Sequence, residues 1–310
     1  MNERKLRIFQ EVATHLNMSA VAGKMYMSQP AVSQVVHELE QELGTRLFDR
    51  IGKKLYLTEA GRLFLHYVRK TLNTYAEGLK AISELNGLET GSLSIGASTT
   101  IGIYVLPDLI GRFHGRHPGV EFSITIEKTK VIAERVLDNA VDFAYVEGPV
   151  ESKEIAVAEF CGDELVFITS PRHPWAAAGQ VDIPDVNRGK FILREAGSGT
   201  REVFEQAMRQ AGADYHVAFE LGNTEAIKKA VEADLGVSCI SLRAVTREVE
   251  LGKLAVVRLN QRHIKRSLNL IYHRDKYMSA LFKAFTQFAR EQVRQPVDEI
   301  HRTLNSEPEA

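Results

Sequence analysis

The fold of the N-terminal region is decided by residues 19–50, SAVAGKMYMSQPAVSQVVHELEQELGTRLFDR. Two short helices separated by a tight turn are expected here, each opened by a serine whose hydroxyl can accept a hydrogen bond from first-turn amides. Ser19 is the predicted N-cap of the first helix and Ser28 that of the second. Pro30 falls in the first turn of the second helix, and Gly44 ends it. Small residues in the first helix let the second approach closely, so the pattern predicts a helix-turn-helix.

The second of these helices is amphipathic. Its apolar residues are spaced by four, three and four positions, which places them on one buried stripe; they are Val32, Val36, Leu39 and Leu43. On the opposite face Gln29 is the best candidate base reader, because one amide can both donate to and accept from the edge of adenine. Any amphipathic helix turns a polar face to water, so the helix alone leaves both interpretations open. The residues predicted to contact DNA from this helix are Ser28, Gln29, Pro30, Ser33, Gln34 and His37.

The segment that follows favours DNA binding. Residues 47–50 and 55–57 are predicted to flank a basic turn. The side chains of residues 55–57 alternate in polarity, as those of a strand do. This arrangement predicts a wing. Basic side chains of a wing meet the sugar-phosphate backbone, and such contacts supply affinity and register without direct sequence information. The predicted phosphate contacts are Arg46, Arg50, Lys53 and Lys54.

Three motifs make this chain resemble the LysR-type transcriptional regulators. They are SQPAVS at residues 28–33, LEQELGTRLFDR at residues 39–50 and LTEAG at residues 57–61, and the resemblance extends more weakly along most of the chain. Met25 and Tyr26 depart mildly from the family pattern, in which smaller or aliphatic residues are commoner. The resemblance implies a winged helix-turn-helix over 1–58, a dimerising linker helix over 59–88, an effector-binding domain over 89–294 and a polar tail over 295–310.

The helix after residue 58 carries an apolar row. Its members alternate three and four positions apart, as the a and d positions of a coiled coil do; they are Leu65, Val68, Leu72, Tyr75, Leu79 and Ile82. The row predicts a homodimer, which could pair further into a homotetramer, and a two-fold protein matches paired DNA half-sites. The alternative is a single helix that packs against its own domain, because the row is shorter than a firm coiled coil requires.

From residue 91 onward the pattern changes to α/β. Short strands alternate with helices, including a helix expected from Ile101 to about His117, and a similar unit recurs in the second half of the chain. The predicted fold class is therefore α/β, with an N-terminal winged helix-turn-helix, a linker helix and two α/β lobes. The family resemblance makes these lobes similar in fold to periplasmic solute-binding proteins. Lobe I is expected over about 91–161 and 268–294 and lobe II over about 162–267, with crossovers near Gly162 and near Arg266 and Ser267.

Two hydroxyl-rich loops precede helices at matching places in the two lobes. Free amides, the positive ends of helix dipoles and hydroxyl donors would converge there, and such a place prefers an anion. Each loop by itself would be ordinary helix capping. The resemblance adds that residues at the positions of Ser98, Thr100, Thr200 and Glu147 line the effector pocket. The predicted effector contacts are Ser98, Thr99, Thr100, Glu147, Glu195, Ser198, Gly199 and Thr200.

A carboxylate at Glu147 would repel a fully ionised ligand, so the ligand is expected to keep a proton or an ammonium group. The first hypothesis is a small sulfur oxyanion, sulfite or sulfate, because the hydroxyl-rich lining with few arginines resembles regulators of sulfur assimilation. An amino or keto acid is the alternative. No cofactor and no metal are expected: His114 and His117 lack a third ligand, and residues 197–199 lack the lysine of a phosphate-binding loop.

Charge and composition agree with a regulator. The 310 residues contain 39 Lys and Arg against 40 Asp and Glu, yet the first 70 or so residues are locally basic. This excludes a coating protein of global positive charge. An enzyme would need a nucleophile or metal centre, and a transport protein would need an export signal, and neither is recognised. A cytoplasmic protein that binds promoter DNA and RNA polymerase but no membrane is expected, with Cys161 and Cys239 as buried thiols and a redox pair as the alternative.

Overall fold

A computed structural model describes residues 1–52, 54–83 and 90–293. The chain divides into two compact units. The first comprises Met1–Asn86 with Asp138–Ala140, and the second comprises Gly87–Leu137 with Val141–Ala310. Among the described residues, no helix is both long and apolar enough to span a bilayer. Lys53, the end of the predicted linker and the predicted tail lie outside the described residues.

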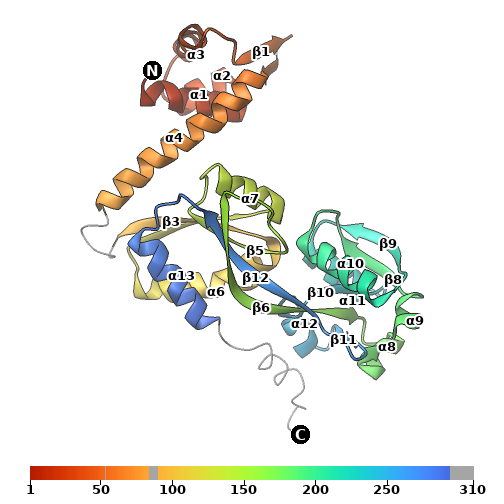
Figure 1. The fold of residues 1–310 in the computed structure, drawn as a ribbon. Helices are drawn as coiled ribbons and strands as arrows, with labels where there is room; N and C mark the ends of the chain where they lie inside the picture. The colour runs from red at the N-terminus through yellow and green to blue at the C-terminus, as the bar shows by residue number, and fades with distance from the viewer. Residues whose placement is uncertain (53, 84–89, 294–310) are drawn as a thin grey trace. The chain divides into compact units, whose positions relative to one another are not determined.

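The first unit is a winged helix-turn-helix followed by a long helix (Figure 1). Its elements are α1 (Glu3–His15), α2 (Met18–Lys24), α3 (Gln29–Leu43), β1 (Phe48–Ile51), β2 (Lys54–Leu57) and α4 (Glu59–Ser83). Strands β1 and β2 pair antiparallel, as a wing requires. The predicted helix-turn-helix and wing are confirmed.

The N-caps of the two short helices differ from the prediction in one case. The side chain of Ser28 accepts a hydrogen bond from the amide of Ala31, so the predicted N-cap of α3 is confirmed. Ser19 was predicted to cap α2, and this is wrong. The carboxamide oxygen of Asn17 accepts from the amides of Ser19 and Ala20, both at 3.0 Å. Asn is as good an N-cap as Ser, and with Asn17 as the N-cap the helix starts two residues earlier than predicted.

The apolar row of α4 divides into two parts. Leu65, Val68 and Leu72 are buried in the core of their own unit, at most 8% exposed, together with α1, α2 and α3. Their side chains are covered by residues of their own unit. Tyr75, Leu79 and Ile82 continue the same row and are 50–65% exposed. The prediction of an intermolecular seam therefore has to rest on the exposed half of the row.

The second unit contains a continuous sheet, described here within residues 90–293. Its strand order is β4-β3-β5-β12-β6-β11-β7, and β10 also pairs with β6. A separate parallel pair is formed by β8 and β9. The bounds are β3 (Gly91–Ala97), β4 (Val120–Ile126), β5 (Phe143–Glu147), β6 (Ile155–Thr169), β7 (Gln180–Val181), β8 (Lys190–Arg194), β9 (His216–Leu221), β10 (Ser238–Ser241), β11 (Ala255–Leu259) and β12 (Ile264–His273).

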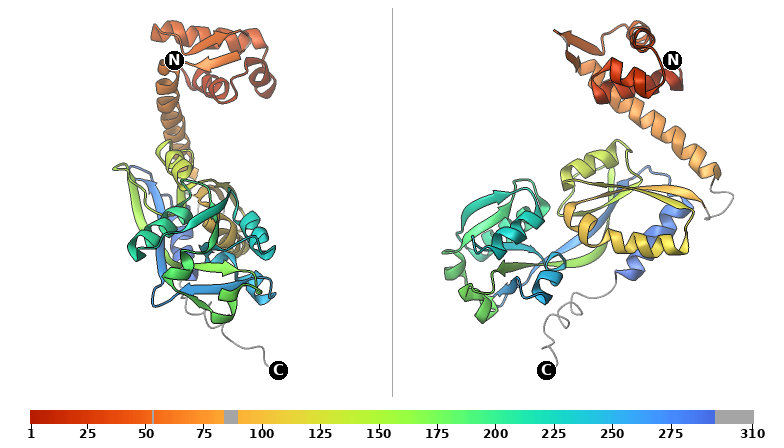
Figure 2. Two further views of the ribbon diagram at one scale, coloured as in Figure 1. Left: turned by 90° about the vertical axis from the view of Figure 1, so that its right-hand side faces the viewer. Right: turned by 180° about the vertical axis from the view of Figure 1, so that it is seen from behind.

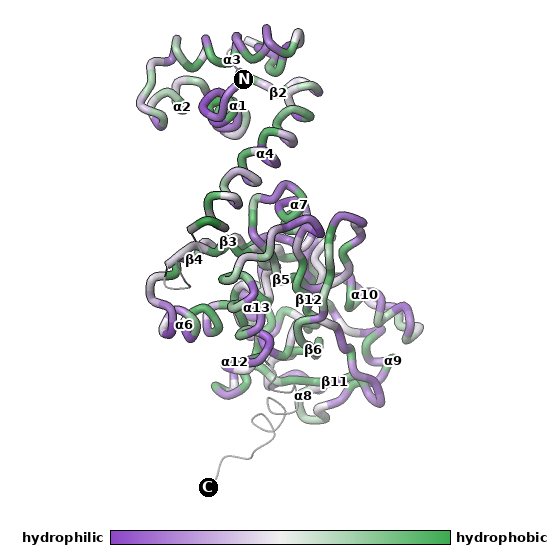
Figure 3. Tube along the Cα trace, turned by 60° about the vertical axis from the view of Figure 1, so that its left-hand side comes forward, coloured by the Kyte–Doolittle hydropathy of each residue, from purple (hydrophilic) through white to green (hydrophobic). Residues whose placement is uncertain are grey.

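Two long antiparallel strands, β6 and β12, run through both lobes of this unit (Figure 2). Gly162 lies opposite Ser267, and Asp163 lies opposite Arg266. The predicted crossovers near Gly162 and near Arg266 are therefore two neighbouring strands of one sheet. Strands β5, β6 and β12 contain hydrophobic residues (Figure 3), and the surrounding helices cover them.

The helices of the second unit follow the predicted alternation with one exception. They are α5 (Thr99–Tyr104), α6 (Leu106–Arg116), α7 (Thr129–Leu137), α8 (Pro174–Ala178), α9 (Ile183–Val186), α10 (Gly199–Ala211), α11 (Thr224–Glu232), α12 (Thr246–Glu250) and α13 (Ala280–Gln292), with a 3-10 turn at Leu242–Ala244. The single helix predicted from Ile101 to about His117 is wrong. It is broken at Val105, because Pro107 lacks an amide and opens a new helix, α6, in its first turn.

Candidate functional site

The outer face of α3 carries polar side chains that are largely open to solvent. Gln29, Pro30, Gln34 and His37 are exposed, and Ser33 is half-buried. The Gln34 amide donates to Glu38, and His37 and Gln41 lie 3.0 Å apart, so two predicted contacts already have partners on the helix. Within the described part of the chain, the side-chain amide of Gln29 has no hydrogen-bond partner. Gln29 is therefore the side chain most available to a base edge.

Two surface hollows flank α3, and Arg50 lines both. One has a volume of about 690 Å³ and extends from Ser33 and His37 to Arg46 and Arg50. The other, of about 360 Å³, lies between Gln29 and the wing residues Arg50 and Lys54. The guanidinium of Arg50 lies 3.4 Å from the Met18 sulfur, which holds the arginine between the two hollows. No Lys or Arg occurs within α3, so the cations of this surface come from the wing and the loop before it.

In the second unit, the predicted effector contacts of lobe I surround a buried carboxylate. Glu147, at the end of β5, is 2% exposed. Its two side-chain oxygens accept hydrogen bonds from Ser98 Oγ at 2.8 Å and Thr100 Oγ1 at 3.1 Å. Thr99 opens α5 and is half-buried. The hydroxyls that were expected to face an anion therefore donate to Glu147 in this state.

A buried arginine joins the two lobes. The Arg266 side chain on β12 is 3% exposed, and its Nε donates to the Asp163 carboxylate at 2.7 Å. Its Nη1 donates to Thr200 Oγ1 of lobe II at 3.1 Å, and its Nη2 donates to Thr100 Oγ1 of lobe I at 3.4 Å. One guanidinium therefore connects the hydroxyl loops of both lobes, as the fork of an arginine allows.

The N-terminus of α10 abuts lobe I at Gly199. A Cβ at this position would lie 2.7 Å from the carbonyl oxygen of Glu147, so only glycine permits the approach. Ser198 precedes it as N-cap and is buried without a side-chain capping bond. Within the described residues, neither the Ser198 hydroxyl nor the hydroxyl hydrogen of Thr200 has an acceptor. These two donors remain available between the lobes.

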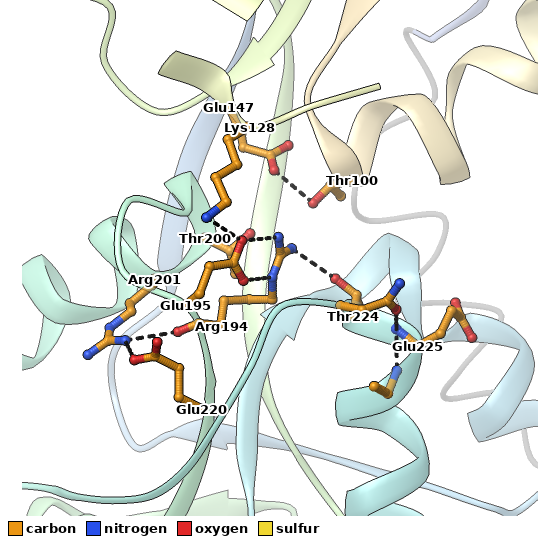
Figure 4. A network of polar contacts seen from close by, with 12 residues as sticks. Thr100, Lys128, Glu147, Arg194, Glu195, Thr200, Arg201, Glu220, Thr224 and Glu225 are labelled. Carbon is orange, nitrogen blue, oxygen red and sulfur yellow. Dashed lines mark hydrogen bonds and ion pairs between the residues drawn. The ribbon is translucent and has the colours of Figure 1, made fainter. Parts of the chain in front are cut away.

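A second ion-pair group crosses between the lobes (Figure 4). The carboxylate of Glu195 accepts from Arg194 Nε at 2.9 Å and Nη2 at 3.1 Å. Lys128 of lobe I reaches the same carboxylate, with 3.2 Å between Nζ and Oε1. Arg194 also donates to Thr224 Oγ1 at 3.2 Å and is almost fully buried. Burial alone would raise the pKa of Glu195, but the hydrogen bonds from Arg194 and from its own backbone, together with Lys128, lower it to about 2.

Three cations of this region were not predicted as site residues from the sequence: Lys128, Arg194 and Arg266. The prediction of a lining with few arginines is therefore incomplete. Arg266 was named only as part of a crossover, and a buried strand that contains Lys265 and Arg266 was the available signal for a paired interior charge. Arg194 is the last residue of β8 and Lys128 lies between β4 and α7, and nothing in the sequence brings them together.

The two cysteines are free thiols. Burial raises the pKa of Cys161 to about 11 and raises that of Cys239 above its usual range. Both groups are therefore protonated at neutral pH, which favours the prediction of inert thiols over a redox pair.

Two family models cover the chain. Residues 86–294 match the LysR substrate binding domain, and residues 4–62 match the bacterial regulatory helix-turn-helix protein, lysR family. The chain belongs to the LysR family. It is a DNA-binding transcriptional regulator with a helix-turn-helix and a two-lobed effector-binding domain, as the sequence predicted.

Relatives of this LysR-type regulator match it over nearly its whole length. A probable RuBisCO transcriptional regulator from Cyanophora paradoxa is 35% identical over 289 residues, which covers 91% of this chain and 89% of the relative. The uncharacterised regulator YeiE of Escherichia coli is 35% identical over 285 residues, covering 92% and 96%.

Solved structures agree in fold. A full-length OxyR variant from Pseudomonas aeruginosa superposes with a TM-score of 0.74 at 22% identity and covers 99% of both chains. The regulatory domain of CcmR from Synechocystis PCC6803, in complex with 2-PG, gives a TM-score of 0.62 at 29% identity. It covers 66% of this chain and 99% of that chain. In this LysR-type regulator the corresponding region contains the hydroxyls, arginines and carboxylates described above.

Proposed function

We propose that this regulator binds promoter DNA through α3 and the wing, and that a small anion between the lobes of its effector-binding domain controls its activity. The DNA contacts proposed are those of the sequence analysis, with Gln29 as the principal base reader and Arg46, Arg50 and Lys54 on phosphates. The proposal for Gln29 is supported by its exposed amide beside a hollow that the wing cations line.

The observation that carries the anion site is the convergence of cations and hydroxyls from both lobes. Arg266 connects Thr100 with Thr200, and Lys128 of lobe I and Arg194 of lobe II both pair with the Glu195 carboxylate. Free hydroxyl donors at Ser198 and Thr200 add to these charges. Arginine forks and hydroxyls are the groups that proteins use for small oxyanions and carboxylates. Ser98, Thr99, Gly199 and Glu147 complete the proposed lining.

The identity of the anion follows from the carboxylate at Glu147. Its two acceptor oxygens take the Ser98 and Thr100 hydroxyls, so a ligand beside it has to bring a hydrogen-bond donor or turn those hydroxyls toward itself. A sulfur oxyanion that keeps one proton, with sulfite ahead of sulfate, is the first candidate. An amino or keto acid is the second. The 2-PG bound to the CcmR regulatory domain makes this compound a third probe.

Ligand binding would act by favouring one arrangement of the lobes over another, because a ligand shifts an equilibrium by as much as its affinities for the two states differ. We further propose a homodimer, or a homotetramer built from it, that uses the exposed row of Tyr75, Leu79 and Ile82. RNA polymerase contact and a cytoplasmic location belong to the same proposal.

A thermal-shift panel tests the anion site. The full-length chain is heated with sulfite, sulfate, 2-PG, glycine, pyruvate and chloride at equal ionic strength, since a ligand that binds the folded state raises the midpoint. Stabilisation by sulfite beyond that by chloride supports the first candidate. Stabilisation by an organic acid alone rejects sulfite, and no stabilisation by any anion rejects the anion site. A footprint on promoter DNA with and without the stabilising anion then tests control; identical footprints and transcription would refute it.

A further inference from the structure

We propose that Glu195 is an internal competitor for the effector: its carboxylate occupies part of the anion site, and an incoming anion takes its place on Lys128 and Arg194. The inference rests on the proposed function and specifies how the same site selects its ligand. It assigns Glu195 a role opposite to that of a direct ligand contact, which was the prediction from sequence.

The contacts of Glu195 are those of a bound anion. Its two oxygens meet the Nε and Nη2 edge of Arg194, the bidentate arrangement by which arginine recognises planar oxyanions. The ammonium of Lys128 approaches from the other lobe and adds a point charge at 3.2 Å. Figure 4 shows this carboxylate between Lys128 and Arg194.

The two cations differ in how firmly they are fixed. Arg194 is 4% exposed, ends β8 and is held from its far side by Thr224, so its fork stays in place when the carboxylate leaves. Lys128 is 44% exposed and reaches from the segment before α7 on a flexible stem. A fixed fork in one lobe and a movable ammonium in the other let an anion bind first and then draw the lobes together.

Glu195 itself can move aside. It lies in the loop between β8 and α10, where the next residues, Ala196 and Gly197, are exposed and Gly197 has a φ of 79°. Its side chain is 16% exposed, so a rotation brings the carboxylate into water without disturbing the core. The charges of Lys128, Arg194 and Glu195 add up to one positive unit, and displacement of Glu195 leaves two positive charges for the ligand.

The consequence is selection by charge. A tethered carboxylate competes at an effective concentration of the millimolar order, so a free monocarboxylate gains little by replacing it. A dianion gains more, because it meets both cations with twice the charge. The regulator should therefore prefer an anion of higher charge over acetate, and this preference should depend on Glu195.

The test compares Glu195→Gln with the wild-type full-length chain by isothermal titration with sulfite, 2-PG and acetate. The amide keeps the shape of Glu195 but has no charge to compete. We expect the variant to bind the preferred dianion about tenfold more tightly, which corresponds to about 1.4 kcal/mol, and to bind acetate measurably. Glu232→Gln is the matched control, because Glu232 pairs with Lys229 within α11 of the same lobe and should leave affinity unchanged. Circular dichroism confirms that both variants are folded.

The outcomes separate the two proposals. If the wild type binds an anion and Glu195→Gln binds it equally or more weakly, the competitor role is refuted and the anion site stands. If only the variant binds, the competitor role is supported in its strongest form. If neither chain binds any probe, the anion site fails and the competitor role fails with it. Lys128→Met, combined with Glu195→Gln, should return the affinity toward that of the wild type or below.

Discussion

The outer face of α3 and the interlobe site are both built from polar residues, but they differ in how those residues are partnered. On α3 the side chain of Gln29 is exposed and available to a ligand. Between the lobes, Glu147, Asp163 and Arg266 are buried, and each has hydrogen-bond partners inside the protein. The first surface can bind by adding contacts, whereas the second has to exchange contacts that already exist.

This difference determines what a ligand gains at each place. Unpaired surface groups lose only water when DNA arrives, and phosphate contacts release counterions, so binding there is strong and depends on salt. Buried pairs are costly to break, because a charge left alone in the interior is poorly solvated. An interlobe ligand must therefore replace the partners that it displaces, which favours ligands of matching charge and shape.

The largest effect is expected from breaking the interlobe network at its centre. Arg266→Met leaves the Asp163 carboxylate, whose side chain is 1% exposed, with Ser241 and the more distant Arg243 guanidinium at 3.8 Å. Removing one member of a buried ion pair costs about 3 to 5 kcal/mol, and we expect about 3 kcal/mol here. Urea unfolding, followed by fluorescence, measures the loss.

The double variant Asp163→Asn with Arg266→Met is its control. It removes both charges and should recover much of that loss, because no buried charge is left unpaired. If Arg266→Met is as stable as the wild type, the Asp163–Arg266 ion pair does not stabilise the fold. The contrast between the paired interlobe groups and the open face of α3 would then no longer hold.

The next effect concerns the close approach of the lobes. In Gly199→Ala the new Cβ meets the carbonyl oxygen of Glu147 at 2.7 Å, and overpacking of this kind costs about 1 to 3 kcal/mol. Gly199 is the first residue of α10, so the helix propensity of alanine offsets less than the roughly 1 kcal/mol of a helix interior, and the clash decides the sign. Gly111→Ala in α6 meets open space and should stabilise by about 0.5 to 1 kcal/mol. Equal stability changes in the two variants would show that the contact of residue 199 with the Glu147 carbonyl oxygen does not require glycine.

On α3 we expect losses in DNA binding without losses in stability. Gln29→Ala should reduce discrimination at one base position by about 1 to 3 kcal/mol, because a bidentate amide contact is lost. Lys54→Ala should instead weaken binding to all sequences and lower the salt dependence by about one phosphate contact. Fluorescence anisotropy with matched promoter and scrambled duplexes at several salt concentrations separates the two. A uniform loss with Gln29→Ala would assign that residue to the backbone.

The same contrast explains what the sequence could predict. The helix-turn-helix is specified by residues close together in the chain: Ser28 caps α3, Gly44 ends it, and Val32 and Val36 mark its buried stripe. The two lobes followed from alternating strands and helices. The N-cap of α2 was predicted two residues too late, at Ser19 and not at Asn17. Asn and Ser are both good N-caps, and sequence alone does not choose between them.

The interlobe network could be predicted only in part. Its hydroxyl loops have a local signature before a helix, and Glu147 came from the family resemblance. Arg266 lies 166 positions from Thr100 and 66 from Thr200, so their contact depends on the register of β6 with β12, which no local pattern reveals. For the same reason the apolar row of α4 gave no sign of where the domain core ends and the exposed half begins.

The smallest expected effect is a pH-dependent difference in stability between Glu195→Gln and the wild type. The pKa of Glu195 is about 2 in the folded state, below its ordinary value of 4.5, because contacts with Arg194 and Lys128 outweigh the effect of burial. The stability that these contacts supply is complete above the unfolded pKa and is lost as pH falls through the folded one. Glu195→Gln should therefore be less stable than the wild type at pH 7, and the gap should narrow at pH 3. Urea midpoints measured for both chains at the two pH values give this difference in stability directly, since all other carboxylates are common to both.

A stability gap that stays constant between the two pH values would mean that the Glu195 charge contributes nothing to the folded state, and the carboxylate would then be a weak competitor for any ligand. A gap that narrows in acid, and that sulfite reduces at pH 7 by stabilising the variant more than the wild type, would connect the internal partner to the anion that replaces it.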